Sequence, residues 1–137
     1  MDDAVVDLYV ELLNEPEAAR REALAQRALT EDAQVFAAHL ADSPPLDRAA
    51  FVEDCGVVQG WRPEGARLRR VGGVDGHHDW LRFAWEVSLP DGQVIEVAGV
   101  RVEGVDVAEV AADGRLRRVV MFQAMLPPPA GAIPREN

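Results

Sequence analysis

The sequence predicts an α+β domain in which three N-terminal helices pack on a curved antiparallel sheet that contains a four-stranded meander. One observation behind this prediction is a helical spacing of apolar residues in the first part of the chain. Another is a series of long alternating segments from Ala66 to Met125, with Asp91-Gly92 and Asp113-Gly114 between them. An Asp-Gly pair between alternating apolar runs is a strong short-range signal for a hairpin. Helices that precede such a meander are expected to cover one face of it.

Three segments carry the helical pattern. Residues 2–13 repeat apolar side chains at i, i+3, i+4 and i+7, and two aspartates stand at the end where the helix dipole favours negative charge. Pro16 is expected to open a second helix that runs to about Leu29. Asp47 is expected to cap a third helix over residues 48–59, which Gly60 ends. Residues 33–40 are short and partly alternating, which favours an edge strand.

The meander is expected to comprise residues 66–74, 77–89, 93–111 and 115–125, with its first turn at Asp75-Gly76. The third segment is long for one strand, and Gly99 and Gly104 inside it indicate bends or bulges. Residues 1–126 are expected to form a single domain. The Pro-rich residues 127–137 are expected to be an extended or disordered tail.

Composition excludes several classes of function. The formal net charge is −10, with 24 acidic and 14 basic residues, which disfavours binding to nucleic acids and to anionic membranes. The chain has no lysine, so it has no side chain for Schiff-base chemistry. The single Cys55 excludes an intrachain disulfide and a multi-cysteine metal site. No metal site and no cofactor are expected, and the absence of a long apolar run predicts a cytoplasmic protein.

Four segments of the chain together resemble the SnoaL-like branch of the nuclear transport factor 2-like (NTF2-like) superfamily. They are residues 73–78 (GVDGHH), 81–85 (LRFAW), 104–109 (GVDVAE) and 113–116 (DGRL). The resemblance covers about residues 1 to 125 and implies a cone-shaped fold with a pocket. It implies no single activity, because this superfamily includes polyketide cyclases, ketosteroid isomerases, dehydratases, epoxide hydrolases and non-enzymatic binding domains.

The resemblance also implies site residues. Asp106 falls where the polyketide cyclases have their acid/base aspartate and where ketosteroid isomerases have a buried, protonated aspartic acid. Tyr9 falls near the oxyanion-hole tyrosine of the isomerases. Their catalytic base would fall near Ala37, which cannot take a proton. If residues 33–40 are extended, His39 shares a face with Val35 and Ala37 and could supply a base from a shifted position.

The residues around Asp106 support a site independently of the resemblance. A carboxylate within an apolar strand is costly to bury unless it is paired, protonated or solvated in a pocket, and burial would raise its pKa. The alternative is that strand alternation places Asp106 on the outer face, in solvent or in a dimer contact. The side chains expected to line the pocket are apolar: Val35, Leu81, Phe83, Trp85 and Phe122.

Two functions follow from these patterns. The first is a small-molecule enzyme of isomerase, cyclase or dehydratase type that uses acid/base catalysis on an apolar, carbonyl-containing ligand. Asp106 would be the acid, His39 the base, and Tyr9 the group that holds an oxygen. The alternative is a non-catalytic ligand-binding or scaffold domain. In either case a homodimer is expected through the convex face of the sheet, where Trp80 and Ala84 lie.

Overall fold

The computed structural model describes residues 2–123, so the predicted tail at residues 127–137 lies outside the described part of the chain. Helices α1 and α2 come first, followed by the edge strand β1, the short 3-10 helix η1 and helix α3, and six further strands follow. In chain order these are α1 (Asp2–Asn14), α2 (Ala18–Ala28), β1 (Leu29–Phe36), η1 (Ala38–Leu40), α3 (Arg48–Gly60), β2 (Arg67–His77), β3 (Trp80–Ser88), β4 (Glu96–Val97), β5 (Val100–Arg101), β6 (Glu103–Val110) and β7 (Leu116–Gln123). None of the helices in residues 2–123 is long and apolar enough to cross a membrane.

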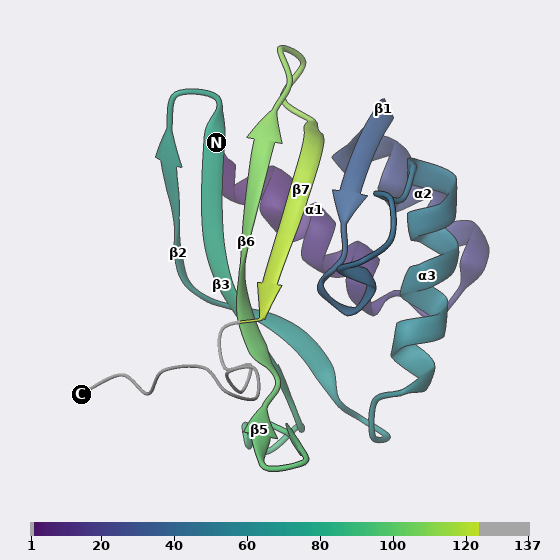
Figure 1. Ribbon diagram of the computed structural model, residues 1–137, viewed down its shortest axis with the longest axis vertical. Coiled ribbons are helices and arrows are strands. Elements are labelled where there is room, and N and C mark those ends of the chain that lie inside the picture. The colour runs from purple at the N-terminus through teal and green to yellow at the C-terminus, as the bar shows by residue number, and fades with distance from the viewer. Residues whose placement is uncertain (1, 124–137) are drawn as a thin grey trace.

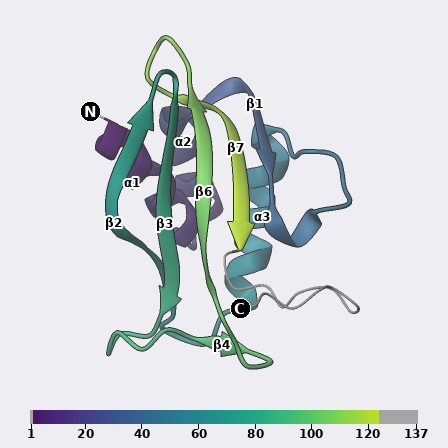
Figure 2. The ribbon, with the colours of Figure 1, turned by 60° about the vertical axis from the view of Figure 1, so that its left-hand side comes forward.

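The main sheet has five strands in the order β1-β7-β6-β3-β2. Neighbouring strands from β2 to β7 are antiparallel, and β1 joins β7 in parallel at the edge. The three helices lie together on one face of this sheet (Figure 1, Figure 2). The predicted α+β class, with three helices on a curved sheet and an antiparallel meander, is therefore confirmed. The parallel edge pair makes the sheet mixed.

The first turn of the meander lies later in the chain than predicted. Strand β2 continues through Asp75-Gly76 to His77, and His78 forms the turn with a positive φ of 57°. The register shifts between Val71 and Asp75, which pair with Ala84 and Arg82, so β2 has more residues than β3 over this stretch. This irregularity absorbs the extra residues and moves the turn toward the C-terminus.

The long segment at residues 93–111 is not one strand. It divides into β4, β5 and β6, and Ala98 and Gly99 form the tight turn between β4 and β5. Both turn residues have positive φ, 53° and 79°, the conformation of a two-residue hairpin turn that glycine favours. Gly104 is not a bulge, because β6 and β3 stay in regular register around it.

Strand β1 ends earlier than expected, which changes the surroundings of His39. Leu46 returns to pair with Val35 through two backbone hydrogen bonds of 2.9 and 2.8 Å. The chain then turns after Phe36 into η1, where the Leu40 amide donates to the Ala37 carbonyl. The predicted extended conformation over residues 33–40 is therefore wrong for its last residues, and His39 lies on a 3-10 helix.

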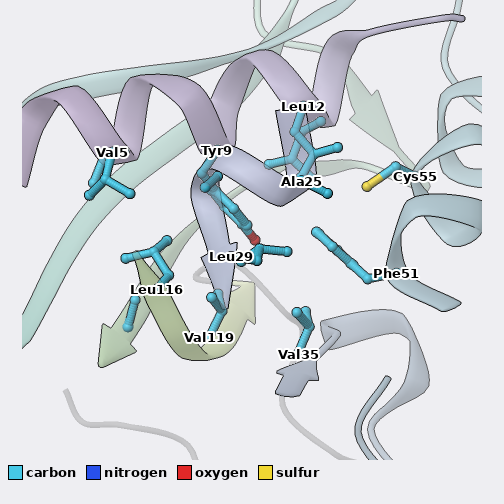
Figure 3. Close-up of a cluster of buried hydrophobic side chains, with 14 of the residues drawn as sticks. Val5, Tyr9, Leu12, Ala25, Leu29, Val35, Phe51, Cys55, Leu116 and Val119 are labelled. Carbon is cyan, nitrogen blue, oxygen red and sulfur yellow. The ribbon is translucent and has the colours of Figure 1, made fainter. Parts of the chain in front are cut away.

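The core lies between the helices and the inner face of the sheet. Side chains from α1, α2, α3, β1 and β7 converge there, as Figure 3 shows for Tyr9, Leu29, Phe51 and Val119. Arg21 joins the helices at one end of this core, because its guanidinium donates to the carbonyls of Glu15 and Pro16 and to that of Val52 on α3. These contacts set the position of α3 over the sheet.

Candidate active site

A cavity of about 240 Å³ lies between α3, η1 and the inner face of the sheet. The hairpin of β4 and β5 extends one side of it. Most of the wall is apolar, including Leu13, Val58, Leu68, Val87, Ile95, Val102 and Met121. The polar side chains that reach it are His39, Asp54, Arg62, Asp106 and Gln123. An apolar cavity with a few polar groups is the usual form of a small-molecule site.

Asp106 projects from β6 into this cavity and is 1% exposed. It pairs in register with Phe83 and Met121, which places all three on the inner face. Of the two orientations that the sequence left open, the structure has the inward one. Burial raises the pKa of Asp106 from its ordinary 3.8 to about 7, and this effect exceeds the opposing effect of two hydrogen bonds that favour the carboxylate.

Those two hydrogen bonds come from residues far apart in the sequence. The Trp85 indole Nε1 donates to Oδ1 of Asp106 at 2.7 Å, and the Tyr9 hydroxyl donates to Oδ2 at 3.1 Å. Both donors are buried. The carboxyl group is therefore fixed in orientation within an apolar wall.

Tyr9 is not part of the cavity wall. Its contact with the site is the hydrogen bond that its hydroxyl donates to Asp106. Its ring is stacked on Phe51 and meets Phe83 edge-on, with centroid distances of 6.0 and 5.9 Å. Burial, followed by the charge of Asp106, raises the pKa of the Tyr9 phenol well above its ordinary value. The hydroxyl therefore remains a hydrogen-bond donor to Asp106 at neutral pH.

Gly104 explains how Trp85 reaches Asp106. The two strands pair Trp85 with Gly104, and a Cβ at Gly104 would lie 2.5 Å from Cζ2 of the Trp85 indole. Because Gly104 has no side chain, the Trp85 indole can occupy this space. From there it reaches the carboxylate of Asp106, two residues further along β6. Sequence reasoning placed Trp85 in the cavity wall but did not identify it as a donor to Asp106.

His39 lines the same cavity and has a carboxylate partner that sequence reasoning missed. Its Nε2 lies 3.1 Å from Oδ1 of Asp54 on α3, and its ring meets the Trp61 ring edge-on at 5.5 Å. When Nε2 carries the proton that is donated to Asp54, Nδ1 has the free lone pair of a base. A signal for Asp54 was present in the sequence, because it shares the apolar helix face of Phe51, three residues earlier.

Four of the apolar residues expected in the cavity wall lie elsewhere. Leu81, Phe83 and Val35 are at most 2% exposed and belong to the packed core. The placement of Phe122 was wrong: it pairs with Val105 on the outer face of the sheet and is 55% exposed. Its neighbours on β7, Met121 and Gln123, line the cavity in its place, because adjacent strand residues point to opposite faces.

Two further residues, one of them in the cavity wall, limit the chemistry of the site. Cys55 also lines the cavity, and burial raises the pKa of its thiol to about 12, so it is not a thiolate nucleophile at neutral pH. Ala37, at the position expected for a base, is buried, and its methyl side chain cannot take a proton. Within residues 2–123, no group of three His, Cys, Asp or Glu side chains is arranged to hold a metal ion.

Comparisons with known proteins give a fold. Neither the models of protein families nor the curated proteins gave a match. Among solved structures, a SnoaL-like family protein from Agrobacterium tumefaciens strain C58, for which isomerase activity has been suggested, is 26% identical with a TM-score of 0.70, covering 87% of this chain and 93% of that one. An NTF2-like protein of unknown function from Exiguobacterium sp. 255-15 is 16% identical with a TM-score of 0.62, covering 85% of this chain and 95% of that one. A protein of cystatin-like fold from Methylobium petroleophilum PM1 is 18% identical with a TM-score of 0.67, covering 98% of this chain and 81% of that one.

Proposed function

We propose that this chain, which has the NTF2-like fold in its SnoaL-like form, is an acid/base enzyme acting on an apolar, carbonyl-containing small molecule. The observation that carries this proposal is Asp106, a buried carboxyl group that lines an otherwise apolar cavity and is held by two donors. With a pKa of about 7, about half of these groups carry a proton at neutral pH. Such a group can both donate and accept a proton during turnover.

The reaction that fits these groups is proton transfer beside a carbonyl. His39 removes a proton from the carbon next to the carbonyl, and Asp106 gives its proton to the carbonyl oxygen, which produces an enol. When the ligand has a β,γ double bond, the enol is a dienol. Transfer of the proton from His39 to the γ-carbon, with return of the enol proton to Asp106, then gives the conjugated isomer. When the β-carbon carries a hydroxyl group, this group leaves as water with the proton from His39, and return of the enol proton to Asp106 gives the α,β-unsaturated product. Asp54 holds the His39 ring and stabilises the imidazolium that forms.

Exchange of hydrogen for deuterium tests the proposal before the natural substrate is identified. A panel of apolar ketones is incubated with the protein in heavy water, and loss of the signal of the hydrogens next to the carbonyl is followed by NMR. Asp106→Asn is expected to reduce the exchange rate by about 100-fold or more, the usual contribution of a general acid or base. His39→Gln is expected to reduce it to a similar extent.

The matched control is Asp75→Asn, which removes an exposed carboxylate that does not line the cavity and is expected to exchange at the wild-type rate. Equal exchange by wild type and Asp106→Asn would refute the acid role. If ketones raise the thermal unfolding temperature by mass action but no variant or wild type catalyses exchange, the protein is a ligand-binding domain. That outcome corresponds to the non-catalytic alternative, which the apolar Ala37 at the expected base position favours.

We also propose that two copies associate through the outer face of the sheet. No helix of the described chain covers this face, which Figure 2 turns toward the viewer. An apolar stripe crosses it, because Val71, Ala84, Val105 and Phe122 are paired in register along four strands. The outer ends of the stripe are 44% and 55% exposed at Val71 and Phe122.

Charge supports a second copy as the partner of this stripe. The chain has a net charge of −10, which opposes self-association in general. On this face, however, Glu86 is paired with Arg69 at 2.7 Å and Glu109 with Arg117 at 3.0 Å. Two copies can therefore meet here without unpaired carboxylates facing each other.

Sedimentation at micromolar concentration tests the dimer. Wild type is expected to sediment at twice the chain mass of 15.0 kDa, and Val105→Glu at the chain mass. Val57→Glu, on the solvent side of α3, is the control and is expected to remain dimeric. A wild-type monomer would refute this proposal.

A further inference from the structure

Arg62 is a positively charged group in the cavity wall that has no carboxylate partner within residues 2–123. It follows α3 and is half-buried. Its one side-chain hydrogen bond is from Nη1 to the neutral amide oxygen of Asn14, at 3.0 Å. Three arginines on the outer surface, Arg69, Arg82 and Arg117, each form an ion pair with a carboxylate instead.

The position of the Arg62 guanidinium is set by the fold. Asn14 at the end of α1 pairs with the backbone of Leu68 on β2 through hydrogen bonds of 2.8 and 2.9 Å. The same Asn14 side chain then accepts from Arg62. The guanidinium is therefore anchored through one nitrogen, and a guanidinium has five N–H donors in total. Donors remain for a ligand in the cavity.

The energetics of this site favour an anion. Burial has the largest effect on the pKa of Arg62 and lowers it; Cys55 acts in the opposite direction, and the nearby positive charge of Arg67 lowers the pKa further. A partly desolvated cation without a counter-ion is costly, and an anionic group brought by a ligand would offset that cost. The other carboxylates at the cavity do not fill this role, since Asp54 lies against His39 and Asp106 against Trp85 and Tyr9.

We propose that Arg62 binds the carboxylate of a substrate, so that the ligands of this cavity are apolar keto acids. The guanidinium presents parallel N–H donors that match the two oxygens of a carboxylate. The carbonyl end of the same molecule lies toward Asp106. This inference rests on the proposed function, because it names the substrate class of the same cavity.

Calorimetric titration with two matched probes tests the role of Arg62. The probes are β-benzoylpropanoate, an aromatic ketone that ends in a carboxylate, and its uncharged methyl ester. Wild type is expected to bind the acid about tenfold more tightly than the ester, and Arg62→Met is expected to abolish this preference by weakening the acid alone. Arg62→Lys keeps the charge without the planar fork and is expected to bind the acid with intermediate affinity.

Arg27→Met is the control, since it removes the same charge from an exposed position on α2 and is expected to keep the wild-type preference. Thermal unfolding of each variant establishes whether it is folded. If Arg62→Met does not fold, the comparison is made with Arg62→Lys alone. An acid-to-ester ratio that is the same in wild type and both Arg62 variants would overturn the inference. If wild type binds the ester as tightly as the acid and Asp106→Asn weakens both, the inference fails while the proposed function stands. If neither probe binds wild type at millimolar concentration, the inference also fails, and the ketone exchange experiment decides the proposed function separately.

Discussion

Replacing Asp106 by asparagine should make the protein more stable at alkaline pH than wild type. The amide has nearly the same shape as the carboxyl group. Its oxygen can accept from Trp85 Nε1 in place of Oδ1, and its NH₂ group can donate to the Tyr9 hydroxyl in place of the Oδ2 contact. The substitution therefore removes the ionisation of the group while its two hydrogen-bonded neighbours keep a partner.

The size of the effect follows from the two pKa values of Asp106. The folded protein holds this proton up to a pH of about 7, whereas the unfolded chain loses it near the ordinary 3.8. Between these values the folded state binds more protons, so its stability falls as the pH rises. Each pH unit corresponds to about 1.4 kcal/mol, and the full loss is about 4 kcal/mol above the folded pKa. Below pH 3.8 the group contributes no difference.

Urea unfolding, followed by tryptophan fluorescence at equal protein concentration, measures this difference. Other titrating groups change the stability of both proteins alike, so the free energy of unfolding of the variant minus that of wild type isolates Asp106. This difference is expected to increase by about 3 kcal/mol in favour of the variant between pH 5 and pH 8. A difference that stays constant over this range would refute the assignment of a raised pKa to Asp106.

Three other substitutions test the surroundings of the carboxyl group and the core. Trp85→Phe removes a hydrogen bond that favours the carboxylate, so the pKa of Asp106 should rise further, as ¹³C NMR titration of its carboxyl carbon would show. Gly104→Ala should reduce the free energy of unfolding by about 1 to 3 kcal/mol, because the added Cβ would overlap with the backbone carbonyl oxygen of Phe122 and with the Trp85 ring. Gly73→Ala, whose added Cβ meets no atom within 4 Å, should have little effect in the same urea titration. Phe51→Ala should reduce it by about 3 to 5 kcal/mol, because this ring is buried against Tyr9; a loss below about 1 kcal/mol would contradict the described packing.

The helices, the turn at Asp113-Gly114 and the candidate acid were predictable from local patterns. The apolar spacing of residues 2–13 predicts a helix with one apolar face, and α1 buries that face. Asp113-Gly114 predicts a turn, and in the structure this turn connects β6 and β7. Asp106 was identified because a carboxylate between apolar strand residues needs a special environment, which is a property of the residue and its immediate neighbours.

The orientation and partners of the site residues needed the tertiary structure. Strand alternation has a period of two, so a shift of one residue exchanges the faces. The register of β6 with β3 and β7 decides which face Asp106 occupies. The same rule placed Phe122 outside, contrary to the prediction. The register is set by how two strands pair, and the sequence of either strand alone does not show it.

The sequence by itself predicts three amphipathic helices, a meander, a strong negative charge and one carboxyl group in an apolar strand. Only the tertiary structure brings Tyr9 and Trp85 to Asp106, across 97 and 21 positions of the chain. Periodicity and turn chemistry act between close neighbours, so they can be read along the chain. Hydrogen bonds between distant residues, and the burial that raises the pKa of a carboxyl group, exist only after helices and sheet have packed together.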